Sequence, residues 1–508
     1  MGLRRNILAS YASQAYVAAV GIVALPFYLR FLGAEAYGLA GFFAMLQAWF
    51  LLLDIGLTPT MARETARFRG HGVSAHDYAS LVRVLRALFV CTAVAGGGLL
   101  FLLAGPIAQH WLQAAHLPVA EVENALRIMA VIVALRWMCG LYRSIVTGSE
   151  QLVWLGNFNA AFATVRSIGV LLALHHIAPT AAVFFGYQLV VAIAELALLA
   201  RHAHTLVPAG APGRSLREAI GVVRPLVRFS LSVAFTASVW IFVTQTDKLI
   251  LSKILPLAEY GYFTLAVLVA GGVMVISGPV SAALLPYMAR LEALQDQPAL
   301  IEAYRRSTQL VVVLAAAASL TLALCAEPLL YAWSGDRLLA GATAPALMLY
   351  ALGNGILTVS SFPYYLQYAK GNLRMHITGS MLFVVFLIPV MSWAADRHGA
   401  MGAGWAWLGM NALYLAGWAP LVHHHLHKGL NRPWFVRDVA SIAIPLVLAG
   451  MVLSQAVSIE DARWVTVAKV VGVLLALVAG GSALTTTGLA RARAWLVDHG
   501  PAAGKSIG

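Results

Sequence analysis

The chain has 508 residues, of which 60% are hydrophobic and only 11% are charged. Soluble domains carry roughly 25% charged residues, so this composition excludes a soluble fold. A strongly positive net charge, here +13, is typical of nucleic-acid-binding proteins. In this chain, however, the basic residues recur at the ends of apolar runs and do not form one patch. We therefore expect no nucleic-acid partner.

Long apolar runs, separated by short polar segments, predict a membrane protein built from helices. About 20 apolar residues in a helix span the ~30 Å hydrocarbon core of a bilayer, and only helices or closed barrels cross it. We see no short alternating segments of the kind that barrel strands show. We therefore predict an all-α polytopic membrane protein with 14 transmembrane helices. In chain order they cover residues 6–30, 38–58, 84–104, 125–147, 157–175, 181–200, 229–252, 260–284, 309–332, 342–366, 375–395, 402–424, 439–457 and 465–488.

The distribution of Lys and Arg orients these helices. With the N-terminus in the cytoplasm, Lys and Arg are about four times as numerous in the predicted inner loops and flanks as in the outer ones, which is the bias of cytoplasmic loops. The same alternation supports the number of helices, because one missed helix would scramble it from that point onward. We therefore expect the N- and C-termini to be cytoplasmic.

Two short motifs recur and indicate a duplication. The stretch LGAEAYG at residues 32–38 resembles LPLAEYG at residues 255–261, and PTMAR at residues 59–63 resembles PYMAR at residues 286–290. Both matches lie at equivalent places, after helices 1 and 7 and after helices 2 and 8. Because six helices per unit preserve the orientation, the two lobes should form a parallel pseudo-two-fold repeat with a site between them. The predicted segments are an N-lobe (1–200), a cytoplasmic linker (201–228), a C-lobe (229–424), a hairpin of helices 13 and 14 (425–488) and a cytoplasmic tail (489–508).

Several motifs resemble those of the Wzx-type O-antigen and polysaccharide flippases. They are PFYLRFLG at residues 26–33, YG at 37–38, LDIGL at 53–57, AR at 62–63, DKLILS at 247–252 and EYGY at 259–262. The chain thus resembles the MATE-like MOP (multidrug/oligosaccharidyl-lipid/polysaccharide) exporter superfamily over its whole length. The resemblance is stronger to the polysaccharide branch than to the drug antiporters or the lipid II flippases.

This resemblance implies a substrate, a location and partners. It implies that the chain flips an undecaprenyl-diphosphate-linked oligosaccharide, such as an O-antigen unit, from the cytoplasmic to the periplasmic leaflet of the bacterial inner membrane. Two lobes would rock around a central cavity. The implied partners are this polyprenyl-diphosphate-linked oligosaccharide, membrane lipid, H⁺ or Na⁺ as a coupling ion, and polysaccharide-assembly proteins.

Two other functions remain open on the sequence alone. One is a cation-coupled exporter of drugs or small molecules from the same superfamily, although drug exporters usually lack the extra helices 13 and 14. The other is a membrane-embedded glycan-processing enzyme. The longest predicted outer loop, residues 105–124, is short and has no Lys or Arg, so we expect no enzyme. We expect no cofactor and no metal either, because P-loop and His-Glu-x-x-His motifs are absent. The histidines at residues 423–425 and 427 are better explained as a solvated cytoplasmic rim.

Charged residues inside the predicted helices are candidate site residues, because a charge deep in lipid costs from ~2.5 to more than 10 kcal/mol. Arg136 and Arg166 lie near the middle of helices 4 and 5, and Arg143 shares a helix face with Arg136. Guanidinium groups bind phosphate oxygens in pairs, so these three arginines, together with Arg30, are candidates for binding a diphosphate. The alternatives are a structural pair between Glu195 and one arginine, and snorkelling of Arg143 to the cytoplasmic rim.

Four charged residues are candidates for gating or ion coupling: Asp54, Glu195, Asp247 and Lys248. For Asp54, a structural pair with a nearby arginine such as Arg63 is the simpler interpretation. Asp247 and Lys248 lie near the outer end of helix 7, and adjacent positions on a helix point about 100° apart, so we expect them to be poor partners for each other. A gate contact through Arg30 and snorkelling of Lys248 both remain open. Polar uncharged residues within the helices, among them Gln47 and Gln188, are explained by interhelical hydrogen bonds or by contacts with sugar hydroxyls.

Overall fold

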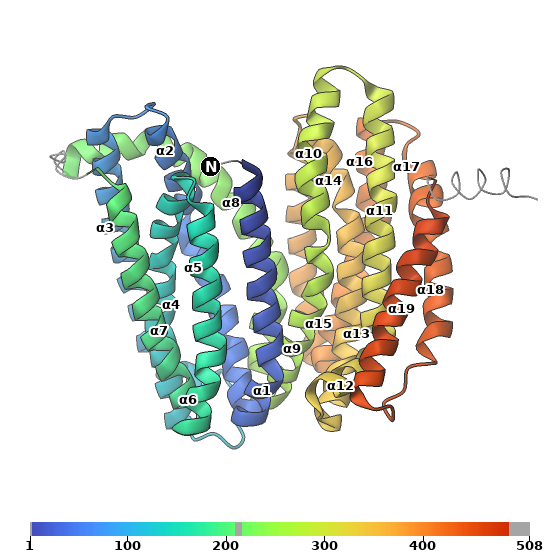
Figure 1. Cartoon of the computed structure of the whole chain (residues 1–508), viewed down its shortest axis with the longest axis horizontal. Helices are drawn as coiled ribbons and strands as arrows, with labels where there is room; N and C mark the ends of the chain where they lie inside the picture. Colours follow the sequence, from blue (N-terminus) through green and yellow to red (C-terminus); the bar gives the residue numbers. More distant parts are fainter. Residues whose placement is uncertain (1–2, 209–215, 487–508) are drawn as a thin grey trace, which may run out of the picture. The chain divides into compact units, whose positions relative to one another are not determined.

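A computed structural model describes residues 3–208 and 216–486 of the chain (Figure 1). Every named element in this part is helical, and its only extended pairing is an isolated bridge between Gln113 and Pro256. The all-α prediction is confirmed. The tail at residues 489–508 and part of the linker lie outside the described residues.

Eleven helical segments in the described part are long and apolar enough to cross a membrane. Two of them contain a break: Gly33 has a φ of 76° within Ala12–Asp54, and Gly399 has a φ of 55° within Arg374–Leu426. Each of these two segments covers two predicted helices. The predicted seventh helix falls in α8 (Leu216–Ile254), which is not among the eleven. The chain is a multi-pass membrane protein, whereas the count of 14 crossings and the cytoplasmic termini remain predictions.

The chain divides into two compact units, Met1–Gly261 and Tyr262–Gly508. Contacts alone do not define a repeat, so the segment boundaries drawn from the sequence remain predictions. The first unit contains α1 (Leu3–Phe50), the 3-10 helix η1 (Leu51–Asp54), α2 (Leu57–Arg69), α3 (Ala75–His110), α4 (Val119–Gly148), α5 (Leu152–Thr164), the π-helical turn η2 (Val165–Gly169), α6 (Val170–His176), α7 (Ala181–Leu206), α8, and the start of α9 (Leu257–Val275).

Helix α4 is the core of the first unit. It packs against α2, α3 and α7, and residues such as Leu126, Val133 and Leu141 on it are fully buried. Neighbouring helices begin at side-chain caps that satisfy free backbone N–H groups: Ser74 accepts from Asp77 N at 3.1 Å, and Thr180 accepts from Val183 N at 3.3 Å. These starts fix where α3 and α7 run beside α4.

The two repeated Tyr-Gly motifs meet in the first unit. A Cβ atom on Gly38 would lie 2.1 Å from the carbonyl oxygen of Leu257, and one on Gly261 would lie 2.8 Å from the carbonyl oxygen of Ala34. Only glycine permits such close backbone contact. This contact gives a physical reason for Gly at both positions.

The second unit contains the rest of α9 and the helices up to the end of the described chain. Its elements are α10 (Ser277–Ala293), α11 (Gln297–Leu324), α12 (Ala326–Ser334), α13 (Arg337–Ser360), α14 (Phe362–Ala369), α15 (Arg374–Leu413), the π-helical turn η3 (Tyr414–Trp418), α16 (Ala419–Leu426), α17 (Asn431–Pro433), the π-helical turn η4 (Trp434–Ala440), α18 (Ser441–Ser454) and α19 (Arg463–Leu484).

A buried polar network fastens the predicted hairpin of helices 13 and 14 to α11. Asp438, which is fully buried, accepts hydrogen bonds from Arg305 Nε at 2.6 Å and from Gln309 Nε2 at 2.6 Å. Gln309 also accepts from the backbone of Thr486 at 3.0 Å. The hairpin is therefore an integral part of the second unit.

A second polar contact lies within the hairpin itself. Asp461, in the loop between α18 and α19, accepts a hydrogen bond from the Lys469 ammonium at 2.7 Å, which lowers the pKa of Asp461.

Candidate anion-binding site

Two pairs of polar side chains link α4 to α7 inside the first unit. We call each pair, Arg136–Gln188 and Arg143–Glu195, a rung. Arg136 and Arg143 are seven residues apart on α4, and Gln188 and Glu195 are seven residues apart on α7, so each pair shares one helix face. Arg136 Nη2 donates to Gln188 Oε1 at 2.8 Å. Arg143 Nη2 forms a hydrogen-bonded ion pair with Glu195 Oε1. One rung therefore ends in a neutral amide and the other in a carboxylate.

Arg136 has only neutral partners. Its Nη1 donates to Gln47 Oε1 at 2.9 Å, and its guanidinium carbon lies 5.3 Å from the centroid of the Phe43 ring. No protein acceptor reaches its buried Nε. Amide oxygens and an aromatic face stabilise a guanidinium without neutralising it. Arg136 thus has no carboxylate within hydrogen-bonding distance, and Glu195 acts on its charge only from the neighbouring pair.

Arg143 is neutralised. Besides Glu195 it binds Asn159 Oδ1 of α5 through Nη1. The Glu195 side chain is only 4% exposed, and no protein donor reaches its Oε2. Of the alternatives that the sequence left open, the structure therefore shows the pair with Glu195 for Arg143. It does not show such a pair for Arg136 or Arg166.

Arg166 lies in the π-helical turn η2. The carbonyl groups of this turn are satisfied by other helices, because Tyr187 donates to Val165 O at 3.0 Å, Gln188 to Arg166 O at 3.3 Å and Tyr28 to Ser167 O at 3.1 Å. The Arg166 side chain is half-buried, and within residues 3–208 and 216–486 its guanidinium has no hydrogen bond or ion pair. It is close enough to Arg136 for mutual electrostatic repulsion. π-helical turns are frequent at functional sites.

The other predicted binding residue, Arg30, does not join this cluster. It is exposed on α1, and it makes no hydrogen bond or ion pair with the described part of the chain. The gate contact between Arg30 and Asp247 or Lys248 is therefore not formed in this structure.

The remaining candidates for gating have local partners. Asp54, at the end of η1, accepts from Thr58 N at 3.1 Å and from Thr58 Oγ1 at 2.6 Å, so it binds the first turn of α2 instead of pairing with Arg63. Lys248 Nζ lies 3.4 Å from Asp247 Oδ1 and donates to Thr244 O at 2.6 Å. The expectation that Asp247 and Lys248 are poor partners for each other is wrong, because the long lysine side chain bends back along the helix and reaches the Asp247 carboxylate.

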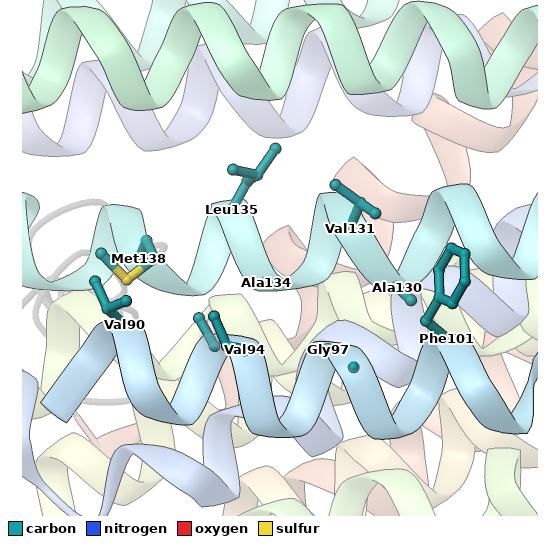
Figure 2. A pocket seen from close by; sticks show the side chains of 11 residues that line it. Val90, Val94, Gly97, Phe101, Ala130, Val131, Ala134, Leu135 and Met138 are labelled. Atoms are coloured by element: carbon teal, nitrogen blue, oxygen red, sulfur yellow. The ribbon is translucent and has the colours of Figure 1, made fainter. Parts of the chain in front are cut away.

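An apolar pocket of about 360 Å³ lies between α3 and α4 (Figure 2). Its lining includes Val94 and Phe101 of α3 and Val131 and Leu135 of α4, and it contains no charged side chain. At 3.6 residues per turn, Val131 and Leu135 point roughly 100–140° away from Arg136 around α4. The pocket is therefore separate from the arginine cluster.

The histidines at residues 423–425 and 427 lie at the C-terminal end of α16. In the described residues, no group of three or more His, Cys, Asp or Glu side chains is placed to hold a metal ion. His423 is fully buried and hydrogen-bonds Tyr304 at 2.8 Å and Asn431 at 3.0 Å. The expectation of a solvated rim is thus wrong for His423, whereas His424 and His425 are exposed.

Two features of the first unit were missed by the sequence analysis. Asn159 holds Arg143, and the only signal for it was a polar residue in an apolar run. Glu35, in the LGAEAYG motif, is buried and accepts backbone N–H groups from Ala115, His116 and Leu117 at 2.9 to 3.1 Å. Its place in a repeated motif was the available signal.

Comparison of the sequence with known proteins finds a family and a relative. A family described as "Polysaccharide biosynthesis protein" matches residues 3–292. A Salmonella typhi protein described as an O-antigen transporter is 22% identical over 288 residues, which is 56% of this chain and 64% of that protein, less than two thirds of its length.

Solved structures show the fold. The lipid II flippase MurJ in an inward closed conformation matches with a TM-score of 0.72 at 11% identity, over 93% of this chain and 98% of that one. An inward-facing multidrug resistance MATE family transporter of the MOP superfamily matches with a TM-score of 0.63 at 12% identity, over 83% and 99%. These matches show that the chain shares the fold of these two transporters, and the family and the O-antigen transporter support the resemblance to the polysaccharide flippases. Since the family model matches more than half of the residues of this chain, the chain belongs to the polysaccharide biosynthesis protein family.

Proposed function

We propose that this protein flips a polyprenyl-diphosphate-linked oligosaccharide from the cytoplasmic to the periplasmic leaflet of the bacterial inner membrane by alternating access between its two lobes. Arg136 and Arg166 bind the diphosphate. The observation that carries this proposal is a pair of arginines inside a membrane unit with no carboxylate partner in the described chain.

The energetics favour an anionic ligand. An uncompensated charge in a membrane protein is costly, so such residues usually face a cavity or a partner and mark a functional site. A phosphate ligand would offset this cost, because guanidinium groups bind phosphate oxygens through charge-assisted hydrogen bonds. The mutual repulsion of Arg136 and Arg166 would fall as well. A membrane-anchored diphosphate meets these requirements, and the family and the O-antigen transporter support a glycan attached to it.

The other charged candidates take secondary roles in this proposal. Arg143 and Glu195 form the edge of the site, and Arg30 attracts the anionic substrate from outside the cluster. Asp247 and Lys248 are proposed to act in gating or in coupling to H⁺ or Na⁺. Asp54 is retained only as a gating residue acting through the first turn of α2, whose Thr58 it binds.

The second candidate function is a cation-coupled exporter of the same superfamily. The similarity to the MATE fold favours it. The excess positive charge around Arg136 opposes it for cationic drugs, because a cation would be repelled by the cluster. Anionic small molecules would remain suitable cargo.

Flipping in proteoliposomes tests the proposal. The wild type is compared with Arg136→Gln, Arg166→Gln and the control Arg127→Gln, which changes an exposed arginine of α4 paired with Glu123 at 2.6 Å. We expect protein-dependent flipping of a fluorescent polyprenyl-diphosphate-linked sugar, a loss of about tenfold or more in each of the first two variants, and no loss in the control. Flipping that survives both substitutions would remove the site, and drug efflux without any flipping would favour the exporter.

A further inference from the structure

Gln188 and Glu195 have the same shape and occupy equivalent places on α7. Each uses Oε1 to accept an Nη2 hydrogen bond from an arginine of α4, and the two rungs lie about 10 Å apart along the helices. They differ in one respect: Gln188 is neutral and Glu195 carries a negative charge. The two pairs therefore differ in charge: Gln188 hydrogen-bonds its arginine without neutralising it, whereas Glu195 neutralises its arginine.

The ion pair between Arg143 and Glu195 leaves the arginine cluster with a defined excess of positive charge. Arg136, Arg143 and Arg166 contribute three positive charges, and Glu195 contributes one negative charge. Besides Arg143, the titratable groups that interact with Glu195 are Arg136 and the buried thiol of Cys139, both on α4. Within the described residues, no other carboxylate pairs with these arginines. The cluster thus carries an excess of two positive charges.

We propose that Glu195 limits this excess to the two charges of a diphosphate, so that the site can load a diphosphate-linked lipid and still release it. The inference rests on the proposed function. In a lipid-diphosphate-sugar each phosphate is esterified or bridged and holds one negative charge, so the diphosphate balances the excess charge of the cluster. A lipid-monophosphate-sugar leaves one positive charge unbalanced.

Glu195 also limits how tightly the substrate is held. A transporter must bind its cargo strongly enough to load it and weakly enough to release it. Without the Glu195 charge, Arg143 would add a third positive charge and retain the diphosphate after the lobes reorient. One unit charge at roughly 10 Å, with an effective dielectric constant near 20, changes affinity by about tenfold.

Isosteric exchange of the two rungs tests this inference. The variants are Glu195→Gln, Gln188→Glu and the double exchange, which restores the wild-type charge with the rungs swapped. Binding and flipping are measured with a polyprenyl-diphosphate-linked sugar and a polyprenyl-monophosphate-linked sugar that share the same chain and sugar. Thermal unfolding of each purified variant verifies that the fold is intact.

Opposite effects are expected from the single exchanges. Glu195→Gln should bind the diphosphate lipid about tenfold tighter and flip it more slowly, because release becomes limiting. Gln188→Glu should bind it about tenfold more weakly and lose most of its preference over the monophosphate lipid. The double exchange should recover both affinity and preference.

Three results would overturn the inference. Unchanged affinity and flipping of the diphosphate lipid in Glu195→Gln, with wild-type flipping intact, would leave the proposed function standing without this role for Glu195. Loss of activity in the double exchange as well as in the singles would mean that the Arg143–Glu195 pair is structural only. A wild type that neither binds nor flips the diphosphate lipid would overturn the proposed function itself.

Discussion

A single carboxylate, Glu35, orders the loop between α3 and α4. Its two oxygens accept four hydrogen bonds from three successive backbone N–H groups, starting at Ala115. Hydrogen bonds to an ionised acceptor are roughly twice as strong as neutral ones, and leaving buried backbone donors unpaired is costly. The loop cannot keep its path without an acceptor at this position.

Replacing Glu35 by Gln should therefore destabilise the protein. The amide retains one acceptor oxygen and places an NH₂ group against backbone donors, so we expect a loss of about 1–3 kcal/mol in the free energy of unfolding. The control is Glu259→Gln, which changes the exposed glutamate of the LPLAEYG motif. Equilibrium unfolding in mixed micelles measures both variants. Equal stability of the two would contradict the role given to Glu35.

At the scale of elements, the close contact between the start of α9 and α1 depends on Gly38. A methyl group there would meet the backbone carbonyl of Leu257, which cannot rotate away as a side chain would. Overpacking of this kind typically costs about 1–3 kcal/mol, so Gly38→Ala should lower the free energy of unfolding by that amount.

Gly21→Ala is the matched control for this prediction. Gly21 lies in the same helix, and no atom is within 4 Å of where its Cβ would be. Alanine favours helix by up to about 1 kcal/mol over glycine, so this variant should be neutral or more stable. A stable Gly38→Ala protein in the same unfolding assay would show that α1 and α9 separate at no cost.

The sequence predicted long helices well and their internal breaks less well. Apolar length alone identifies a membrane helix, and the spacing of Arg136 and Arg143 already predicted a shared face. The π-helical turn at Arg166 was not predictable, because its carbonyl groups are satisfied by Tyr28, Tyr187 and Gln188 from other helices. The pairing of Arg143 with Glu195, rather than of Arg136, likewise depends on how α4 and α7 align, which no local pattern specifies.

At the scale of the whole molecule, the number of crossings depends on the two broken segments. If Arg374–Leu426 crosses the bilayer twice, its break at Gly399 lies on the opposite side from both of its ends. Its 53 residues would extend about 80 Å as one straight helix at 1.5 Å per residue, far beyond a hydrocarbon core of ~30 Å. A double crossing is therefore the arrangement that fits a bilayer.

Cysteine accessibility tests this arrangement in cells. In a background without Cys91, Cys139 and Cys325, single cysteines replace Asn372, His398 or Lys428, all of which are exposed. A membrane-impermeant maleimide should label His398→Cys in intact cells with a permeable outer membrane. It should label Asn372→Cys and Lys428→Cys only after the inner membrane is opened, because the excess of Lys and Arg places those loops in the cytoplasm.

The pattern of labelling decides whether Arg374–Leu426 crosses the bilayer twice and in which orientation. If all three positions react in intact cells, the segment does not cross the bilayer and the prediction of 14 helices is wrong. If only Asn372→Cys and Lys428→Cys react, the segment crosses twice in the inverted orientation. The predicted pattern, with His398→Cys alone accessible, would show that Arg374–Leu426 crosses the bilayer twice with both of its ends in the cytoplasm, as the excess of Lys and Arg in the flanking loops requires.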